Sequence, residues 1–166
     1  MVRIIGNKGR DFPQASSEQI KISSHSLQFF SSKAPEFIDI TDQVLELIKE
    51  CQINMGLAVI YSMHTTAAIK INENEPLLLS DMEIFLDRLS PKSAEYSHND
   101  FTQRTVNMTE DECPNGHSHC QHLILSTSET VPIVLGKPQL GQWQRIFLVE
   151  LDRPRPREVL VQVLGI

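Results

Sequence analysis

The stretch Ile40–His64, ITDQVLELIKECQINMGLAVIYSMH, carries a helix pattern that is followed directly by a strand pattern. Its first half has apolar residues at helical spacing, and Thr41 is a residue type that caps the free amide groups at the start of a helix. Its second half, residues 57–61, is apolar on both faces and too short for a helix, which predicts a strand covered on both sides. His64 therefore stands at the end of a buried strand.

Two further helices are predicted on the C-terminal side of this stretch. Ser80 and Glu83 form a capping box at the start of an apolar helical pattern, which Ser90 and Pro91 end. For residues 115–126 a short helix is favoured, although alternate histidines there also fit one face of a strand.

Alternating or β-branched segments predict the remaining strands. Residues 20–22 and 27–29 alternate apolar with polar side chains, so two strands joined by a turn at residues 23–25 are expected. The other predicted strands cover residues 131–135, 143–151 and 159–164. Helices dispersed among strands with hairpin-length connections indicate an α+β fold, with a largely antiparallel sheet and two or three helices.

Length and composition set the class of protein. A chain of 166 residues fits a single compact domain, which we place at residues 18–166, after a flexible N-terminal extension at residues 1–17. The formal charge of −6, from 21 acidic and 15 basic residues, argues against a nucleic-acid partner. The 3 cysteines lack metal-binding spacing and favour a reducing cytoplasm, and no apolar run is long enough to span a membrane.

Four arginines gather late in the chain. They are Arg145, Arg153, Arg155 and Arg157. Guanidinium groups bind phosphate or carboxylate by paired hydrogen bonds, so such a patch could hold a small anion. Acidic residues lie among these arginines, so they could equally form a solvated face of ion pairs. The sequence leaves both interpretations open.

Histidines give the strongest indication of chemistry, because imidazole carries protons near neutral pH and is the commonest metal ligand. Five of the 6 histidines fall at the edges of patterned segments: His64, His98, His117, His119 and His122. At the strand end, a rigid sheet could aim the imidazole of His64 and the hydroxyl of Thr65 into a cleft. The alternative is a hydrogen-bonded structural histidine.

The densest cluster is NGHSHCQH, which begins at Asn115. In an extended chain His117 and His119 project to one side and suit a Zn²⁺ ion, whereas a helix would pair His119 with His122. A catalytic zinc takes three protein ligands and keeps an open position, so we expect His98 as the third ligand.

Other polar residues add to this site, and several common motifs are missing. Asp100, two residues from His98, could fix the tautomer of that ring, or the two side chains could bind the same cation. The hydroxyl-rich segment 126–130, which includes Ser128, could hydrogen-bond an anion.

The sequence has no nucleophile elbow, CxxC redox motif, phosphate loop or dinucleotide-binding glycines, which sets those classes of enzyme aside.

Six motifs in order resemble the YjbQ family, which is also called UPF0047 or the secondary thiamine-phosphate synthase family. They are His64–Ala68, Asn72–Asn74, Tyr96 with His98 and Asp100, Asn115–His119, Leu140–Gln144 and Pro154–Arg157. The resemblance implies a compact α+β domain and a homotrimer. It also implies a histidine-rich site near subunit contacts that binds a metal ion or an oxyanion. The implied activity is weak: it joins a phosphorylated thiazole to a pyrimidine pyrophosphate and releases pyrophosphate.

The resemblance also assigns site positions. The residues that match those of the family are His64, His98, Asp100, Asn115 and His119. His117 stands where many relatives carry aspartate, which is also a metal ligand. Arg153 replaces the glycine that is expected before Pro154.

Two functions from different classes are compatible with these residues. The first is a metal-assisted enzyme that acts on a small phosphorylated or anionic substrate with a divalent metal, zinc being the first candidate. It assigns the metal to His98, His117 and His119, catalysis to His64 and Asp100, and substrate binding to Thr65, Asn115, Ser128 and Arg155. The second is a noncatalytic trimer that binds small anions as a sensor or carrier.

Overall fold

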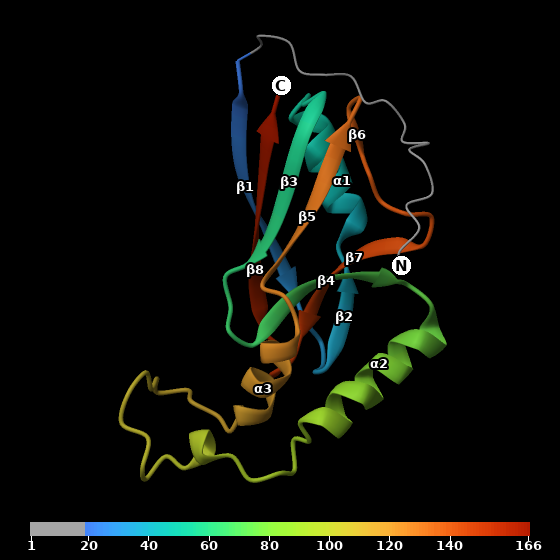
Figure 1. Ribbon diagram of the computed structural model, residues 1–166. Helices are drawn as coiled ribbons and strands as arrows, with labels where there is room; N and C mark the ends of the chain where they lie inside the picture. Colours follow the sequence, from blue (N-terminus) through green and yellow to red (C-terminus); the bar gives the residue numbers. More distant parts are fainter. Residues whose placement is uncertain (1–18) are drawn as a thin grey trace, which may run out of the picture.

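Two antiparallel sheets form the framework of residues 19–166, the part of the chain that this computed structural model describes (Figure 1). The larger sheet has the strand order β1-β8-β3-β5-β6, and the smaller one has the order β2-β7-β4. The strands are β1 (Lys21–Phe30), β2 (Glu36–Asp39), β3 (Met55–Ser62), β4 (Ala67–Glu73), β5 (Ser128–Val134), β6 (Lys137–Pro138), β7 (Gln144–Glu150) and β8 (Pro156–Gly165). The helices are α1 (Thr41–Glu50), α2 (Pro76–Leu89), α3 (Gly116–Ile124) and the short 3-10 helix η1 (Ser97–Asn99). The predicted extension at residues 1–17 lies outside the described residues.

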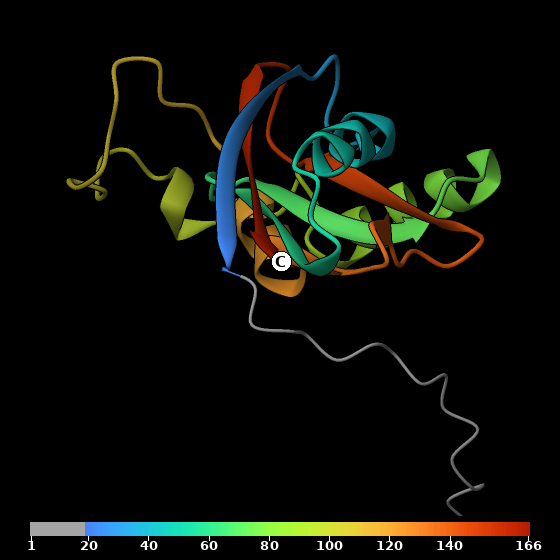
Figure 2. The ribbon, with the colours of Figure 1, turned by 90° about the horizontal axis from the view of Figure 1, so that it is seen from above.

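Helix α1 packs on the sheets and forms the main core. Its residues Val44, Leu47 and Ile48 are buried among apolar side chains of β3, β5, β7 and β8. Figure 2 shows the strands curling partway round this helix. Burying a side chain of this size contributes about 1.5–3 kcal/mol, so the apolar pattern of α1 is enough to hold it against the sheets. The α+β prediction is thus confirmed, with three α-helices in one compact domain.

Strand β7 is buried on both faces and separates two cores. Ile146 faces the α1 core, whereas its neighbour Phe147 joins a second core that includes Leu86 of α2. Strands β2 and β4 pair with β7 on either side. The sequence predicts neither strand, because β2 is only 4 residues long and β4 passes from buried to exposed residues without alternating. Because β4 begins at Ala67, residues 63–66 directly connect one sheet to the other.

Strand β1 overturns one prediction. It runs without a break from Lys21 to Phe30, and each of its 10 residues is paired with β8. The predicted turn at residues 23–25 is therefore wrong. Ser23 and His25 continue the alternation of half-buried and exposed positions, and a half-buried face at a sheet edge accepts such polar side chains.

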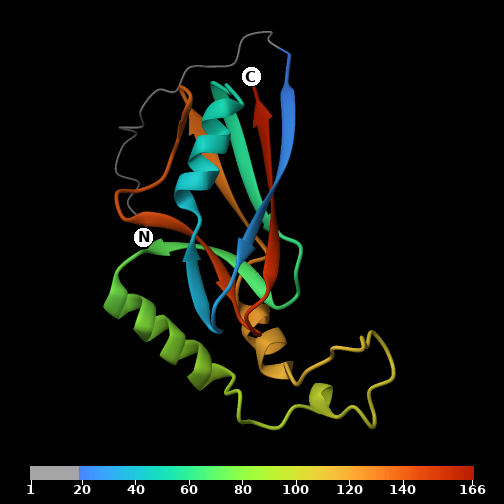
Figure 3. The ribbon, with the colours of Figure 1, turned by 180° about the vertical axis from the view of Figure 1, so that it is seen from behind.

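Helix α2 begins five residues before the predicted start, since its cap is Glu75 and the predicted cap is Ser80. Its first residue is Pro76, and the carboxylate of Glu75 accepts hydrogen bonds from the amides of Leu77 at 3.0 Å and Leu78 at 2.7 Å. A capping carboxylate followed by proline is a favourable helix start, so the capping box predicted at Ser80 is wrong. Figure 3 shows α2 lying beside the small sheet, on the side away from α1.

The other two helices agree better with the sequence. Helix α1 begins at Thr41, although the carboxylate of Asp39, 3.0 Å away, accepts the free amide hydrogen of Thr41 in place of a threonine cap. Helix α3 confirms the short helix favoured for residues 115–126. Within residues 19–166, no helix combines the length and the apolar character that crossing a membrane requires.

Candidate functional site

A polar cleft opens where the connections between the two sheets meet the start of α3. The β3–β4 connection, the segment between β7 and β8, η1 and the loop of residues 100–114 all contribute to its walls. Its volume is about 840 Å³. The residues that line it are Met63, His64, Thr65, Thr66, Ser97, His98, Arg104, Val106, Asn107, Glu112, Asn115, His119, Arg155 and Arg157.

Six of the nine predicted site residues line this cleft. They are His64, Thr65, His98, Asn115, His119 and Arg155. Asp100, His117 and Ser128 do not line it. Ser128 lies on β5, paired with Tyr61 of β3, which places its backbone within the larger sheet. The fold therefore gathers histidines that are far apart along the chain, but not all of the predicted set.

The main chain of β8 fixes the ring of His64. Its Nε2 accepts a hydrogen bond from the amide of Glu158 at 2.9 Å, so the neutral ring carries its proton on Nδ1. Burial lowers the pKa of His64 below its ordinary value, the positive charge of Arg157 lowers this pKa further, and the charge of Glu150 opposes both. His64 is therefore neutral near pH 7, and its Nδ1 is a hydrogen-bond donor.

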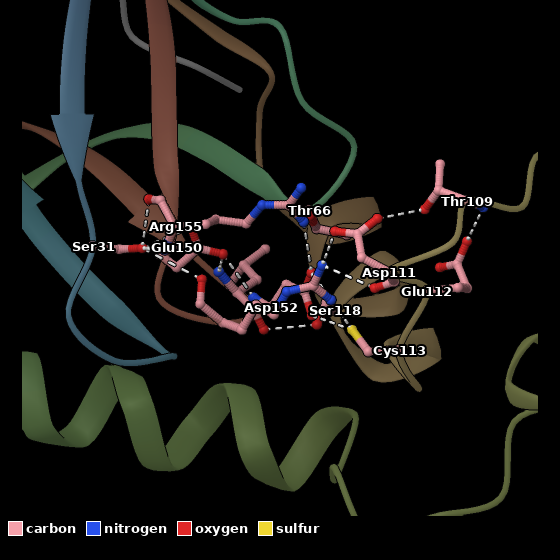
Figure 4. A network of polar contacts seen from close by, with 12 residues as sticks. Ser31, Thr66, Thr109, Asp111, Glu112, Cys113, Ser118, Glu150, Asp152 and Arg155 are labelled. Carbon is pink, nitrogen blue, oxygen red and sulfur yellow. Dashed lines mark hydrogen bonds and ion pairs between the residues drawn. The ribbon is translucent and has the colours of Figure 1, made fainter.

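A buried ion pair borders the cleft beside His64. Arg157 Nε and Nη2 each lie 2.6 Å from an oxygen of Glu150, and the two side chains are 3% and 0% exposed. Arg157 Nη2 also donates to Thr66 Oγ1 at 3.0 Å. Ser31 Oγ and the amide of Asp152 donate to the same carboxylate (Figure 4). Glu150 is thus fully hydrogen-bonded, and the charge of Arg157 is compensated within the protein.

Two other arginines present free donors to the cleft. Arg155 is 37% exposed and donates to Asp152 at 3.3 Å, which leaves most of its N–H groups for a ligand (Figure 4). Arg104 Nη2 donates to the carbonyl of Asn107 at 2.7 Å and to Glu112 at 3.2 Å. Arg104 Nη1 is buried, and no group in residues 19–166 accepts a hydrogen bond from it.

The late arginines do not form one patch. Arg145 pairs with Asp39 at 2.7 Å and Asp42 at 3.0 Å, outside the cleft, whereas Arg155 and Arg157 line the cleft itself. The two interpretations left open by the sequence therefore apply to different arginines. Arg145 follows the ion-pair interpretation, and Arg155 has the exposure that an anion contact needs.

His98 and His119 lie side by side in the cleft. Their ring centroids are 4.7 Å apart and the rings are inclined at 64°. Burial lowers the pKa of His119, and the nearby His98 and Arg104 lower it further. His98 Nε2 and Asn115 Oδ1 are both buried without a hydrogen-bond partner in the described chain. Buried polar atoms are rarely left unpaired, and both of these residues line the cleft, so a molecule bound there is a candidate partner for them.

His117 is directed away from this pair. Its ring is buried beside Tyr96, with centroids 6.4 Å apart, and its Nε2 lies 3.2 Å from Ser118 Oγ. Successive residues of an α-helix are rotated by about 100°, so His117 and His119 point to different sides of α3. The extended geometry that would have placed both on one ion does not occur, because α3 is a helix.

The predicted three-histidine metal set is therefore not assembled. No three His, Cys, Asp or Glu side chains between residues 19 and 166 are placed to hold one metal ion. Asp100 does not support His98 either, because its carboxylate accepts hydrogen bonds from Thr102 and Gln103, which lower its pKa. Between residues 19 and 166 the adjacent histidines of the cleft number two, His98 and His119, which is one fewer than the three ligands that a catalytic zinc takes from protein.

Sequence reasoning missed Arg104 and Glu112. Both line the cleft from the long loop between η1 and α3, where no periodic pattern or motif singles out any residue. Only the packing of this loop beside α3 brings them to the histidines.

These features define an α+β domain whose two antiparallel sheets and third helix surround a cleft of histidines, arginines and hydroxyl groups. The chain belongs to the UPF0047 protein YjbQ-like family, whose family model matches residues 25–166. A UPF0047 protein of Methanothermobacter thermautotrophicus is 38% identical over 146 residues, which span 88% of this chain and 94% of the relative. The UPF0047 protein YugU of Bacillus subtilis is 33% identical over 141 residues, 84% of this chain and 98% of the relative.

Solved structures agree with this assignment. A YbjQ-like protein of unknown function from Sulfolobus solfataricus P2 superposes with a TM-score of 0.81 at 32% identity, and the match covers 89% of this chain and 100% of that one. An uncharacterised conserved protein of the YjbQ/UPF0047 family from Clostridium acetobutylicum gives a TM-score of 0.73 at 34% identity, covering 84% and 98%. The resemblance noted in the sequence is thus confirmed for family and fold.

Proposed function

We propose that the cleft binds a small phosphorylated molecule and that His64 stabilises its reacting group through a hydrogen bond from Nδ1. The observation that carries this proposal is that three residues lining one cleft each have a buried polar atom without a hydrogen-bond partner. These atoms are Arg104 Nη1, His98 Nε2 and Asn115 Oδ1, and none of them has a partner in the described chain. A phosphate with hydroxyl or amine groups would supply both the acceptors and the donors that these atoms lack.

Recognition would rest on directed hydrogen bonds rather than on a strong positive field. Glu112, Glu150 and Asp152 each pair with one of the cleft arginines, so most of the positive charge is compensated. Arg155 keeps enough free N–H groups for a bidentate contact with a phosphate, which is stronger than a contact between neutral groups. The cleft would therefore favour a small anion of defined shape.

His64 suits the role of a neutral hydrogen-bond donor. Its Nε2 accepts the amide hydrogen of Glu158, so this nitrogen takes up no proton while that bond is kept, and the ring meets a ligand through its Nδ1–H. A neutral imidazole in this position would donate a hydrogen bond to an oxygen of the bound phosphate. That bond would strengthen as negative charge develops on a leaving oxygen, which is how a neutral histidine stabilises a reacting group without giving up a proton.

A divalent ion is a second component of the proposal. His98 and His119 would supply two imidazole ligands, and oxygens of the bound phosphate would complete the coordination, since the described residues offer no third ligand. Such an ion supplies positive charge that stabilises a reacting phosphate. The reaction implied by the family resemblance, thiamine-phosphate synthesis, is one narrow form of this proposal.

A noncatalytic anion-binding role is the second candidate. It is favoured by the position of Asp100, which is engaged by Thr102 outside the cleft, so that no carboxylate contact fixes His98. A sensor or carrier needs Arg155 and the histidines for binding, and it needs no stabilisation of a reacting group.

The first prediction concerns ligand binding, with inorganic phosphate and pyrophosphate as probes in isothermal titration calorimetry. Arg155→Met should weaken binding roughly ten- to a hundredfold, because a charge-assisted hydrogen bond contributes about 1.5–3 kcal/mol. His119→Ala should also weaken it. Arg145→Met changes the net charge by the same amount outside the cleft and should leave the affinity unchanged. Equal effects of the two arginine variants would contradict the proposed site.

Turnover separates the two candidate functions. His64→Gln should retain phosphate binding and lose product formation in a screen of phosphorylated substrates, with and without added Zn²⁺ or Mg²⁺. Ligand binding without any product from the unaltered protein would favour the noncatalytic role. For the thiamine-phosphate reaction, product above the level of the His119→Ala variant is required.

A further inference from the structure

The loop of residues 100–114 supplies one wall of the cleft, yet most of its polar contacts are internal. Its residues Arg104, Val106, Asn107 and Glu112 line the cleft, and Arg104 hydrogen-bonds both Asn107 and Glu112. Figures 1 and 2 show this loop, in yellow, projecting away from both sheets. Its place over the cleft therefore depends on a small number of attachments.

Arg153 provides the main attachment. Its Nη2 donates to the carbonyl of Asp111 at 3.3 Å and to the carboxylate of Asp111 at 3.1 Å, and its Nη1 contacts Cys113 Sγ. The thiol of Cys113 donates in turn to Asp152 Oδ1 at 3.5 Å (Figure 4). In the part of the chain that the structure describes, no other hydrogen bond or ion pair joins residues 100–114 to the sheets or to the segment between β7 and β8.

We propose that Arg153 is a positioning residue that fastens this loop and thereby sets the affinity of the cleft for an anion. Arg153 does not itself line the cleft, so it would act through the loop residues Arg104 and Glu112, which do. The ligand part of this inference rests on the proposed function. The attachment of the loop stands on the contacts of Arg153 alone.

Arg153 can also affect the cleft through the carboxylate of Asp152. The buried carboxylate of Asp152 lies 3.3 Å from Arg155 and 3.9 Å from Arg153, so two arginines share one negative charge. Charges interact more strongly where water is partly excluded. Without Arg153, Asp152 would hold Arg155 more firmly, and fewer N–H groups of Arg155 would be free for a ligand. Both routes predict weaker anion binding when Arg153 is removed.

The contacts of Arg153 should fix the position of the loop 100–114 but add little to the free energy of unfolding. Arg153 is 31% exposed and Asp111 is 74% exposed, and ion pairs with this exposure add little to the free energy of unfolding. Variants at Arg153 are therefore expected to fold with nearly unchanged Tm. A change in affinity can then be assigned to the loop rather than to loss of the fold.

The second prediction tests this inference with Arg153→Ala and Arg153→Lys, and with Arg145→Ala as a control of equal charge change. Inorganic phosphate is titrated by calorimetry, and the reaction of Cys113 with a thiol reagent is timed in a background that carries Cys51→Ser and Cys120→Ser. Arg153→Ala should raise the Kd for phosphate by about five- to tenfold and speed the reaction of Cys113 when the rate is expressed per thiolate. This normalisation is needed because loss of the Arg153 charge raises the pKa of the Cys113 thiol and by itself slows the reaction. Arg153→Lys should recover part of both effects, and Arg145→Ala should cause neither.

The two readouts separate this inference from the proposed function. Unchanged Cys113 reactivity in Arg153→Ala would overturn the attachment, and an unchanged Kd would overturn its effect on the cleft. If the unaltered protein binds no phosphate, the proposed function fails, while the Cys113 rate still decides whether Arg153 fastens the loop.

Discussion

Arg155 and Arg157 stand two positions apart and have different roles. Arg157 is enclosed with Glu150, and its guanidinium orients Thr66 at the edge of the cleft. Arg155 has its hydrogen-bond partner, Asp152, on one side only and remains open to solvent on the other. The sequence identifies both as cations, but only the packing of Glu150 against Arg157 decides which one is available to a ligand.

The third prediction concerns this buried pair. Arg157→Met should lower the free energy of unfolding by about 3–5 kcal/mol, because it leaves the Glu150 charge buried and uncompensated. Arg145→Met, which removes a more exposed arginine from its carboxylates, should cost about 1 kcal/mol or less. Urea unfolding measures both values.

The double variant Arg157→Met with Glu150→Leu serves as the control for that prediction. Removing both charges should recover most of the lost stability, since no unpaired ion remains. Equal destabilisation by the single and double variants would show that packing, rather than charge, dominates at this position.

At the scale of elements, the sequence predicts periodic segments well and irregular ones poorly. The apolar stripe of α1 was found because its pattern has the helical period. The apolar run of residues 57–61 correctly predicts a strand, but the expectation that both of its faces are covered is wrong, because Leu57 and Tyr61 of β3 are 40% and 41% exposed. The unbroken β1 was not found, because its half-buried face carries Ser23 and His25. For the site, His64 was found at a strand end, whereas the contributions of the loop 100–114 depend on tertiary packing that leaves no local pattern.

Helix α2 exposes several large apolar side chains. Leu86 is its one fully buried residue, whereas Leu77 and Phe85 are 75% and 56% exposed. Exposed apolar groups on one element mark contact surfaces for other proteins. We propose that α2 takes part in the homotrimer that the family resemblance implies.

The fourth prediction tests α2 as a contact surface. Phe85→Glu places a charge on the apolar face and should reduce the mass measured by light scattering from that of a trimer to that of a single chain. Gln28→Glu, on the exposed face of β1, adds the same charge elsewhere and should leave the mass unchanged. A single-chain mass for the unaltered protein would contradict the proposal.

At the scale of the whole molecule, folding removes several histidines from water. Burial is the largest cause that lowers the pKa of His64, His117, His119 and His122. A histidine with a lowered pKa in the folded state binds fewer protons than it does in the unfolded chain. Its contribution to stability is complete above the unfolded pKa of about 6.5 and is lost as the pH falls below that value.

The fifth prediction is a loss of stability in mildly acidic solution. Tm, followed by circular dichroism, should fall between pH 7.5 and pH 5, at about 2–4 °C for each kcal/mol lost. Carboxylates take up protons at lower pH than this window. For Asp39, burial raises the pKa, but hydrogen bonds from Arg145 and Thr41 outweigh burial, so its pKa lies below the ordinary value. His117→Phe should flatten the dependence, because the substituted ring takes up no proton. A constant Tm over this interval would contradict the prediction.

The pairing of β1 with β8 has a consequence for engineering the protein. Lys21 lies opposite Gly165, so the beginning of the first strand and the end of the last one are neighbours. Figure 1 shows both at the end of the molecule opposite α3. A fluorescent reporter or an affinity tag fused near either of these residues would therefore emerge on the far side from His119 and leave the entrance to the cleft unobstructed.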